Sequence, residues 1–310
     1  MSTRVRLGRS ELQVSPICYG SWQASPKFWG EVPADDLIAA MRRAFEVGVN
    51  FYDTADAYGD GYSETLVGKA LAELPREQVV VATKVYHHFY PDGHRHPDLS
   101  GKYVIEECHA SLKRLRMDYL DLYQLHSWDS LTPLEETTEA LEKLKKDGRI
   151  RAYGVSNFTV EQLRLARKIG DYATLQPRYS LLDRGIESDL LPYCAAEDIG
   201  VLVYSPLCFG LLTGKFDGSE TFTDLRGRHP RFQGEKFKTL AEAVRSLKPM
   251  ADKYGLSIVQ LALATTLAHP AVTCTIVGTK NPAQIEESAG AMGKTIERDD
   301  YYAVRNTLQD

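Results

Sequence analysis

The chain has 310 residues, of which 43% are hydrophobic and 25% charged, and its formal net charge is -5 at pH 7. This composition is typical of a soluble globular protein and provides no basic footprint for nucleic acid or anionic membranes. No apolar run approaches the length of a membrane span, and the N-terminus lacks the apolar segment of a signal peptide. The five scattered cysteines form no CxxC pair. We therefore expect a cytoplasmic protein with reduced thiols.

Strand patterns alternate with helix patterns from one end of the chain to the other. A short pair at residues 4–7 and 12–16 frames a polar turn and predicts an N-terminal β-hairpin. The strand patterns that follow are ICYG (17–20), NFYD (50–53), VVVATK (79–84), LDLYQLH (120–126), RAYGVS (151–156), TLQ (174–176), GVLVYS (200–205) and CTIVG (274–278). Eight strands with intervening helices predict a parallel sheet.

The helix patterns carry their own end signals. Residues 34–48 place apolar side chains at i, i+3 and i+4 spacing and stop at Gly48. Residues 134–148 begin with acids, end with lysines and stop at Gly148, which complements the helix dipole. Thr159, followed by Gln162, matches the capping-box pattern at the start of a further helix.

The parallel sheet has two possible arrangements, a closed barrel and an open doubly wound sheet. The open sheet usually carries a GxGxxG turn after an early strand, and this chain has none. We therefore predict an α/β fold of the (β/α)8 TIM-barrel type, a single domain spanning 1–310. The stretch from Leu207 to Lys238 has no strand pattern and is predicted to be a lid loop after the seventh strand, with Asp224 and Arg226 as candidate latch residues.

Four polar residues follow neighbouring strands: Asp53, Tyr58, Lys84 and His126. In a barrel these positions meet at the C-terminal face, where active sites form. An ammonium near a phenol stabilises the phenolate, so we expect Lys84 to lower the pKa of Tyr58 and Asp53 to hold Lys84 in place. His126 can donate a hydrogen bond to a carbonyl oxygen or assist proton delivery. Taken one at a time, an ion pair or a packed tyrosine is the commoner explanation of such residues. Their combination on one barrel face favours a proton-handling site.

The chain resembles the aldo-keto reductase superfamily along nearly its whole length. The resemblance rests on FYDTADAYGDGYSETLVGKAL, the lysine of VVVATK, the histidine of LDLYQLH, and the later GVSNF, YSPLCFGLLTGK and IVGTKNPAQIEES, in that order. The YSPL…GLLTGK and DLR…F…GEKF segments are closest to bacterial inositol-cluster-type reductases and to the potassium-channel β-subunit branch. The resemblance implies an NADPH-dependent reduction of aldehydes or ketones, sugar-derived ones included, with NADH as a second possible cofactor.

By this resemblance the four strand-end residues match the family's catalytic tetrad, with Tyr58 as general acid. The residues that the resemblance assigns to the cofactor are Ser156, Asn157 and Gln176 at the nicotinamide amide, Tyr204 on its ring, Ser205, Leu207, Gly210, Leu212 and Lys215 along the pyrophosphate, and Gly278, Thr279, Lys280, Gln284, Glu287 and Ser288 at the adenosine end. The family often has Asn at the position of Ser288, which leaves one adenine contact open. Trp22 matches a substrate-pocket position, and a packed core tryptophan is the alternative.

Elementary chemistry agrees with the phosphate assignments. Ser205, Gly210 and Gly214 permit close backbone approach to a ligand, although loop turns also use glycine. Lys280 precedes a helix pattern that opens at Asn281, and a helix N-terminus suits a phosphate. Lysine at position 280 indicates NADPH over NADH, whereas a solvated surface charge is the alternative.

The stretch HHFYPDGHRHP (87–97) contains four histidines. The carboxylate spacing of zinc motifs is missing from it, so we interpret it as a variable substrate-side loop without metal, with Phe89 and Tyr90 as candidates for the pocket wall. Two other functions stay open: a class I aldolase with Lys84 as Schiff-base nucleophile, and a non-catalytic NADPH-binding regulator. The substrate is a small carbonyl compound of unspecified identity, and the oligomeric state is open.

Overall fold

The computed structural model describes residues 4–90 and 92–308. Eight parallel strands form a closed barrel, namely β3 (Ile17–Gly20), β4 (Phe51–Asp53), β5 (Val80–Val85), β8 (Leu120–Leu125), β9 (Ile150–Ser156), β10 (Tyr172–Gln176), β11 (Gly200–Tyr204) and β12 (Cys274–Gly278). The last strand pairs with the first, and Thr275 lies opposite Ile17. The predicted (β/α)8 barrel is confirmed, and the strand boundaries differ from the predicted ones by at most two residues.

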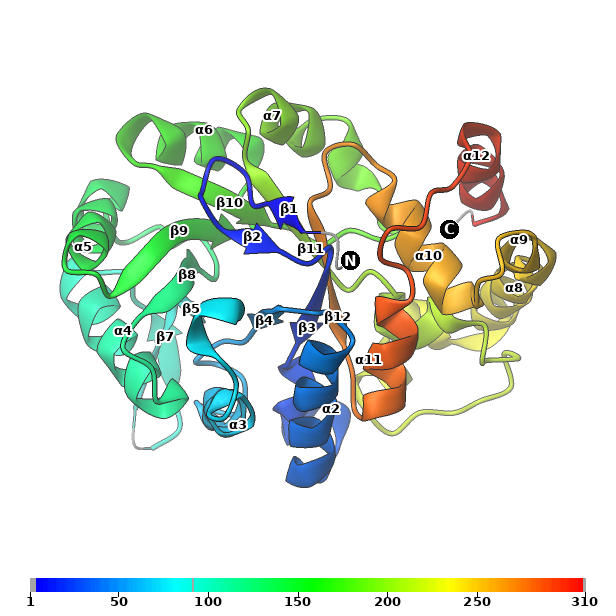
Figure 1. Cartoon of the computed structure of the whole chain (residues 1–310), viewed down its shortest axis with the longest axis horizontal. Coiled ribbons are helices and arrows are strands. Elements are labelled where there is room, and N and C mark those ends of the chain that lie inside the picture. Colours follow the sequence, from blue (N-terminus) through cyan, green and yellow to red (C-terminus); the bar gives the residue numbers. More distant parts are fainter. Residues whose placement is uncertain (1–3, 91, 309–310) are drawn as a thin grey trace.

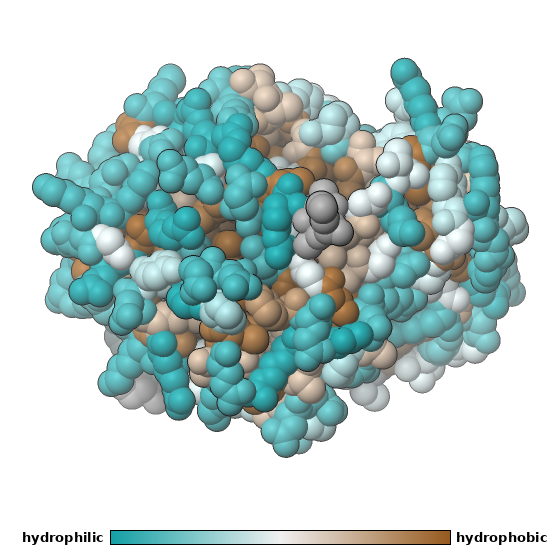
Figure 2. All heavy atoms as spheres, in the orientation of Figure 1, coloured by the Kyte–Doolittle hydropathy of each residue, from teal (hydrophilic) through white to brown (hydrophobic). Residues whose placement is uncertain are grey.

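Helices surround the barrel on its outside (Figure 1). They are α1 (Pro26–Trp29), α2 (Ala34–Glu46), α3 (Tyr62–Leu71), α4 (Gly101–Leu115), α5 (Leu134–Lys146), α6 (Val160–Ile169), α7 (Leu190–Ala196), α8 (Gly234–Arg245), α9 (Lys248–Lys253), α10 (Ile258–Leu267), α11 (Pro282–Ala289) and α12 (Arg298–Thr307). The helix α2 buries Leu37, Ala40, Met41 and Ala44, one turn apart along a single face. Hydrophilic side chains dominate the outer surface seen in Figure 2. No helix of the described residues is long and apolar enough to cross a bilayer.

Helix ends follow the signals in the sequence. The Thr159 hydroxyl accepts from the Gln162 backbone N–H, and the Gln162 side chain accepts from the Thr159 N–H, so the predicted capping box is confirmed. Gly48 and Gly148 end their helices with φ of 90° and 70°, a conformation that only glycine adopts without strain.

The predicted N-terminal hairpin, β1 (Val5–Arg6) and β2 (Gln13–Val14), lies at the centre of the barrel end that faces the viewer in Figure 1. Its side chains Leu7 and Leu12 are buried in one apolar cluster with barrel residues such as Phe51 and Leu122. At Gly8 a Cβ atom would lie 2.3 Å from the backbone nitrogen of Gly200, so only glycine permits this contact. The hairpin thereby closes the end where β11 begins, which leaves the opposite end for the polar site.

Two loops at the other end have more structure than the sequence predicts. The strands β6 (His87–Phe89) and β7 (Arg95–Pro97) pair as an antiparallel hairpin, where we expected a loop. The predicted lid segment contains the 3-10 turns η4 (Cys208–Thr213), η5 (Leu225–Arg228) and η6 (Pro230–Phe232), and α8 begins before its end. Its phenylalanines pack on one another and make a small core of their own, consisting of Phe216, Phe222, Phe232 and Phe237.

Candidate active site

Lys84 connects the predicted residues at the C-terminal end of the barrel. Its Nζ donates to Asp53 Oδ1 at 2.6 Å, to the Thr54 carbonyl at 2.8 Å and to the Tyr58 hydroxyl at 3.4 Å. The side chain of Lys84 is 0% exposed and that of Asp53 3%. Gln176 donates to the second oxygen of Asp53 at 2.8 Å. The carboxylate is thus held on both oxygens, which fixes the ammonium beside the phenol.

Lys84 and His126 differ in protonation at neutral pH. Burial on its own would lower the pKa of Lys84, but Asp53 and Tyr58 outweigh it and the pKa is raised, so Lys84 is charged. Burial, with the charges of Lys84 and of any protonated His87, holds the pKa of His126 well below its usual value, so His126 is neutral at pH 7. The His126 ring meets the Tyr58 ring edge-on, with centroids 5.9 Å apart.

The expected direction for Tyr58 is wrong. Burial of the hydroxyl raises its pKa, and the opposing effect of Lys84 is smaller, so the net shift is upward. Tyr58 therefore carries its proton throughout the neutral range. An attached proton is what a general acid needs, whereas a lowered pKa would have favoured the phenolate.

A single cavity of about 690 Å³ extends from this group. It contacts Trp22 and every residue of the predicted catalytic tetrad and of the predicted cofactor set except Lys84 and Leu212. Lys84 lies beneath the cavity floor, behind Asp53 and Tyr58. Leu212 is fully buried in the hydrophobic core, and its backbone N–H is bonded to the Leu207 carbonyl, so the predicted cofactor contact of Leu212 is not supported.

Three side chains assigned to the nicotinamide amide form a linked set on one wall. The amide of Asn157 donates to the His126 carbonyl at 3.0 Å and accepts from the Tyr204 hydroxyl at 2.9 Å. Ser156 donates to the Gln176 carbonyl at 2.8 Å. These bonds join β9, β10 and β11 at their C-terminal ends, so the polar groups are preorganised around one part of the cavity.

The other end of the cavity is strongly cationic. Lys215, Lys280 and Arg226 all line it. Burial lowers the pKa of both lysines, and repulsion from Arg226 lowers it further. A bound polyanion would relieve this repulsion. The Thr279 hydroxyl lies in the same wall, buried and without a hydrogen-bond partner among the residues described. The site therefore fits a phosphate-bearing cofactor.

The helix α11 continues this wall. The Asn281 side chain caps it by accepting from the Gln284 N–H at 3.1 Å, and the Gln284 side chain accepts from the Lys280 N–H at 2.8 Å. Glu287 lines the cavity. Ser288 lines it too, although its hydroxyl donates to the Gln284 carbonyl within the helix.

The backbone after β11 is held in an unusual conformation. Ser205, Cys208 and Phe209 have φ of 56°, 47° and 56°, in the left-handed region that is rare outside glycine. Asn157, which also lines the cavity, has φ of 59°. Residues with such strained backbone conformations are concentrated at active sites and ligand-binding sites. The sequence shows the glycines of this segment, but it does not show that the neighbouring non-glycine residues adopt the left-handed conformation.

The sequence reading missed several wall residues. An aromatic wall faces Tyr58, where Trp22 packs edge-on against Trp29 at 5.4 Å and lies 6.4 Å from Phe209. Trp22 lines the cavity, and its contact with a substrate stays a prediction. Phe89 and Tyr90 do not line the cavity, and the same hairpin contributes His87 and Arg95 instead. The register of β6 and β7 places His87 and Arg95 on one face of the hairpin, and a loop assignment cannot supply this register.

Asp224 and Arg226 were predicted as candidate latch residues of the lid segment. The two residues bind each other within one 3-10 turn, at 2.6 Å. The pair therefore orients Arg226 toward the cationic end of the cavity, which it also lines.

A buried Lys–Asp–Tyr group joined by one cavity to a cluster of cations defines a nucleotide-cofactor-binding barrel with a proton-handling centre. The Aldo/keto reductase family model matches residues 16–308. The chain belongs to the aldo/keto reductase family.

Curated relatives span almost the whole chain. "Aldo-keto reductase YhdN" of Bacillus subtilis is 38% identical, with 96% of this chain and 91% of that protein aligned. The "NADH-specific methylglyoxal reductase" of Escherichia coli is 35% identical over 93% of each chain. A "Putative voltage-gated potassium channel subunit beta" of Schizosaccharomyces pombe is 37% identical, over 92% of this chain and 87% of that one. The resemblance to the channel-subunit branch is confirmed.

Solved structures agree with the fold. The glycerol dehydrogenase AKR11B4 from Gluconobacter oxydans superposes with a TM-score of 0.91 at 35% identity, covering 99% of this chain and 95% of that one. An aldo/keto reductase from Klebsiella pneumoniae in complex with NADP and acetate has a TM-score of 0.78 at 31% identity, covering 99% and 96%.

Proposed function

We propose that this protein is an NADPH-dependent reductase that converts small aldehydes or ketones to alcohols, with Tyr58 as the proton donor. The observation that carries the proposal is the position of Lys84, whose ammonium lies between Asp53 and the Tyr58 hydroxyl beneath the cavity floor. A charged lysine there stabilises the phenolate left after proton transfer, without itself losing a proton.

The roles of the residues follow from their charges. When bound, the nicotinamide cofactor supplies a hydride to the carbonyl carbon. Tyr58 transfers its proton to the carbonyl oxygen, and Lys84 stabilises the resulting phenolate until water at the open cavity reprotonates it. Neutral His126 has one N–H to donate, and it holds the carbonyl oxygen beside Tyr58. Asp53 and Gln176 keep Lys84 in position.

The preference for NADPH rests on the cationic end of the cavity. Lys280 and Lys215 have no carboxylate partner among the residues described, and they lie beside Arg226, which is paired with Asp224. A 2′-phosphate would give these two lysines an anion in addition to the pyrophosphate. The Klebsiella relative is described with NADP, which supports the proposal. The Escherichia coli relative is described as NADH-specific, so the family accepts either cofactor and this end of the cavity decides between them.

The aldolase and the regulatory role have less support than the reductase. A Schiff-base aldolase needs a neutral lysine, whereas Lys84 is paired with Asp53 and its pKa is raised. A purely regulatory role is suggested by the channel-subunit name of one relative. Against it, all four proton-handling residues are present and joined in one group.

Steady-state assays test the proposal directly. The untagged protein is mixed with a panel of aldehydes and ketones, and loss of absorbance at the nicotinamide wavelength is followed with NADPH and, separately, with NADH. We expect turnover with a higher kcat/KM for NADPH. NADPH binding by fluorescence titration without turnover of any carbonyl would support the regulatory role instead, and borohydride trapping of a substrate on Lys84 would support the aldolase.

We further propose that the segment 207–238 closes over the bound cofactor. It supplies Phe209, Lys215 and Arg226 to the cavity wall while its own phenylalanine core keeps it folded as a unit. Limited proteolysis is expected to cut this segment more slowly when NADPH is present. An unchanged cutting rate would contradict closure.

A further inference from the structure

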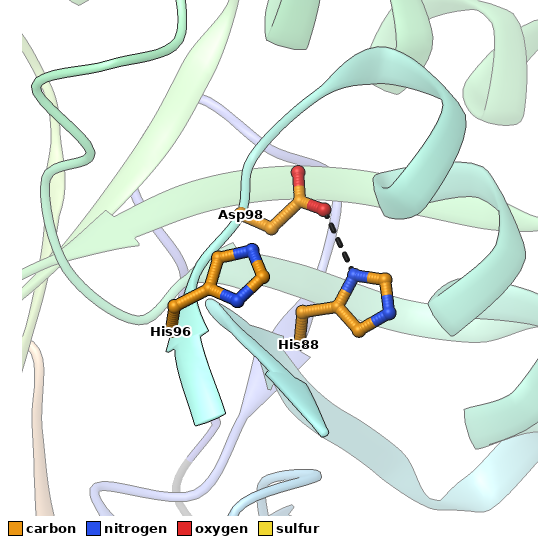
Figure 3. Close-up of side chains that lie close together, drawn as sticks. All are labelled: His88, His96 and Asp98. Carbon is orange, nitrogen blue, oxygen red and sulfur yellow. Dashed lines mark hydrogen bonds and ion pairs between the residues drawn. The ribbon is translucent and has the colours of Figure 1, made fainter. Parts of the chain in front are cut away.

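We propose a second, non-catalytic site on this protein: a Zn²⁺ site formed by His88, His96 and Asp98 on the outer face of the β6–β7 hairpin. Their ligand atoms all lie within 4.8 Å of one another (Figure 3). The four histidines of the stretch 87–97 had been interpreted as lacking a carboxylate partner. Asp98, one residue beyond that stretch, supplies it.

The strand register brings these side chains together. His88 lies directly opposite His96 in the antiparallel pair, and the backbone N–H of Asp98 continues the ladder by donating to the Tyr86 carbonyl at 2.8 Å. Residues two apart on a strand share a face, so His96 and Asp98 point to the same side as His88. Figure 3 shows the three side chains directed toward one another from this face.

Two of the three ligands are held in place by neighbouring groups. The His88 ring stacks on Tyr103 of α4, with centroids 4.4 Å apart and planes inclined by 12°. Asp98 accepts from His88 Nδ1 at 3.0 Å through one oxygen and from the Ser100 N–H at 2.9 Å through the other. His96 is exposed and makes ring contacts but no hydrogen bond with the described part of the chain. A preformed His–Asp pair beside a free imidazole is therefore available to a cation.

The chemistry of the set suits zinc. Two imidazoles and a carboxylate are ligands that Zn²⁺ accepts, with water completing the tetrahedron. Ligand atoms about 2.1 Å from a tetrahedral zinc lie about 3.4 Å from one another. His88 Nδ1 and Asp98 are already 3.0 Å apart, so the exposed His96 ring is the ligand that would have to adjust. The thiols do not compete, because all five cysteines are buried.

Zinc bound at this site would affect the catalytic cavity through the hairpin, although the site itself lies outside the cavity. His87 and Arg95 occupy the opposite face of the same hairpin and line the cavity. Zn²⁺ bound across β6 and β7 would cross-link the two strands that carry these wall residues, and so stiffen this part of the wall.

Isothermal titration with Zn²⁺, on the full chain without an affinity tag, tests the site. We expect saturable binding of one Zn²⁺ per chain. His96→Gln and Asp98→Asn should each weaken binding at least about tenfold, because each removes one of three ligands. His109→Gln, which removes an exposed histidine on α4, is the matched control and should leave binding unchanged. Circular dichroism of each variant verifies that it is folded.

Two results would overturn the site. One is the absence of saturable binding by the wild-type protein up to about 100 μM free Zn²⁺, well above the range of a three-ligand site. The other is binding of equal strength in wild type and His96→Gln, which would leave His88 and Asp98 as a simple hydrogen-bonded pair. The outcome is independent of carbonyl reduction, because no catalytic residue contributes to the site.

Discussion

Lys84 and Asp53 form a hydrogen-bonded ion pair of 2.6 Å from which solvent is almost entirely excluded. A buried charge without a partner is strongly destabilising, because no favourable interaction offsets the free energy lost on removing it from water. Each residue of the pair therefore compensates the buried charge of the other, and the pair places the ammonium beside Tyr58. Loss of either residue would leave the other charge buried and unpaired.

The losses of stability from removing Lys84 and from removing Asp53 should not add. We expect Lys84→Met to lower the free energy of unfolding by about 3–5 kcal/mol, since Asp53 is left buried and unpaired. The double variant Lys84→Met/Asp53→Asn should lose clearly less than the sum of the two single variants, measured by urea denaturation. The exposed pair Lys143–Asp147 is the control, and Lys143→Met should cost less than about 1 kcal/mol. Additive losses at positions 53 and 84 would contradict this coupling.

Tyr58→Phe should abolish reduction and spare cofactor binding. The variant keeps the ring but has no proton to give, so kcat is expected to fall at least about 100-fold. Tyr62→Phe, on an exposed ring at the start of α3, is the matched control and should behave like wild type. The affinity for NADPH, measured by fluorescence titration, should be unchanged in both. A Tyr58→Phe rate within about tenfold of wild type would remove Tyr58 from the mechanism.

Lys280→Gln should change which cofactor is preferred. Loss of one cation from the cavity end is expected to raise the KM for NADPH at least about tenfold, as for a lost charge-assisted hydrogen bond, while the KM for NADH stays within about threefold. Lys294→Gln, at an exposed position outside the cavity wall, is the control. Equal effects on both cofactors would mean that Lys280 contacts a group that NADPH and NADH share.

His126 should make the protein less stable in acid. Its pKa is held well below the usual value in the folded state by burial, by Lys84 and by His87, so between that pKa and about 6.5 only the unfolded chain binds the proton. Stability therefore falls as the pH drops through 6.5. Comparing wild type with His126→Asn, we expect the wild type to lose about 1 kcal/mol more between pH 7.5 and 5.5. The comparison isolates His126, because His87 and His269, whose pKa values are also lowered, are present in both proteins. Identical losses in the two proteins would contradict a depressed pKa for His126.

Arg95 should favour substrates that carry an anionic group. It lines the cavity and has no ion-pair partner among the residues described. We expect Arg95→Gln to lower kcat/KM for 4-carboxybenzaldehyde at least about tenfold and to leave benzaldehyde nearly unchanged. Arg298→Gln, an exposed position on α12, is the control. A parallel loss for both aldehydes would show that Arg95 shapes the hairpin without recognising charge.

Local signals in the sequence were sufficient for the architecture. The alternation of strands and helices predicted the barrel, and Gly48, Gly148 and the Thr159 capping box marked helix ends correctly, because these signals act within a few residues. The order of the strands was enough to place Asp53, Lys84 and His126 at one barrel mouth. The rule that parallel strands end on the same side needs no side-chain detail.

What the sequence did not determine depends on residues far apart in the chain. The upward shift in the pKa of Tyr58 follows from burial under the cavity wall, and no local pattern reports burial. The inward position of Arg95 and the outward position of His96 depend on the register of a hairpin that the sequence alone presented as a loop. Composition and spacing determined the fold and the four strand-end residues. Tertiary packing decided their protonation, the aromatic wall from Trp22 to Phe209, and the position of Asp98 beside two histidines, because each of these results from contacts between distant segments.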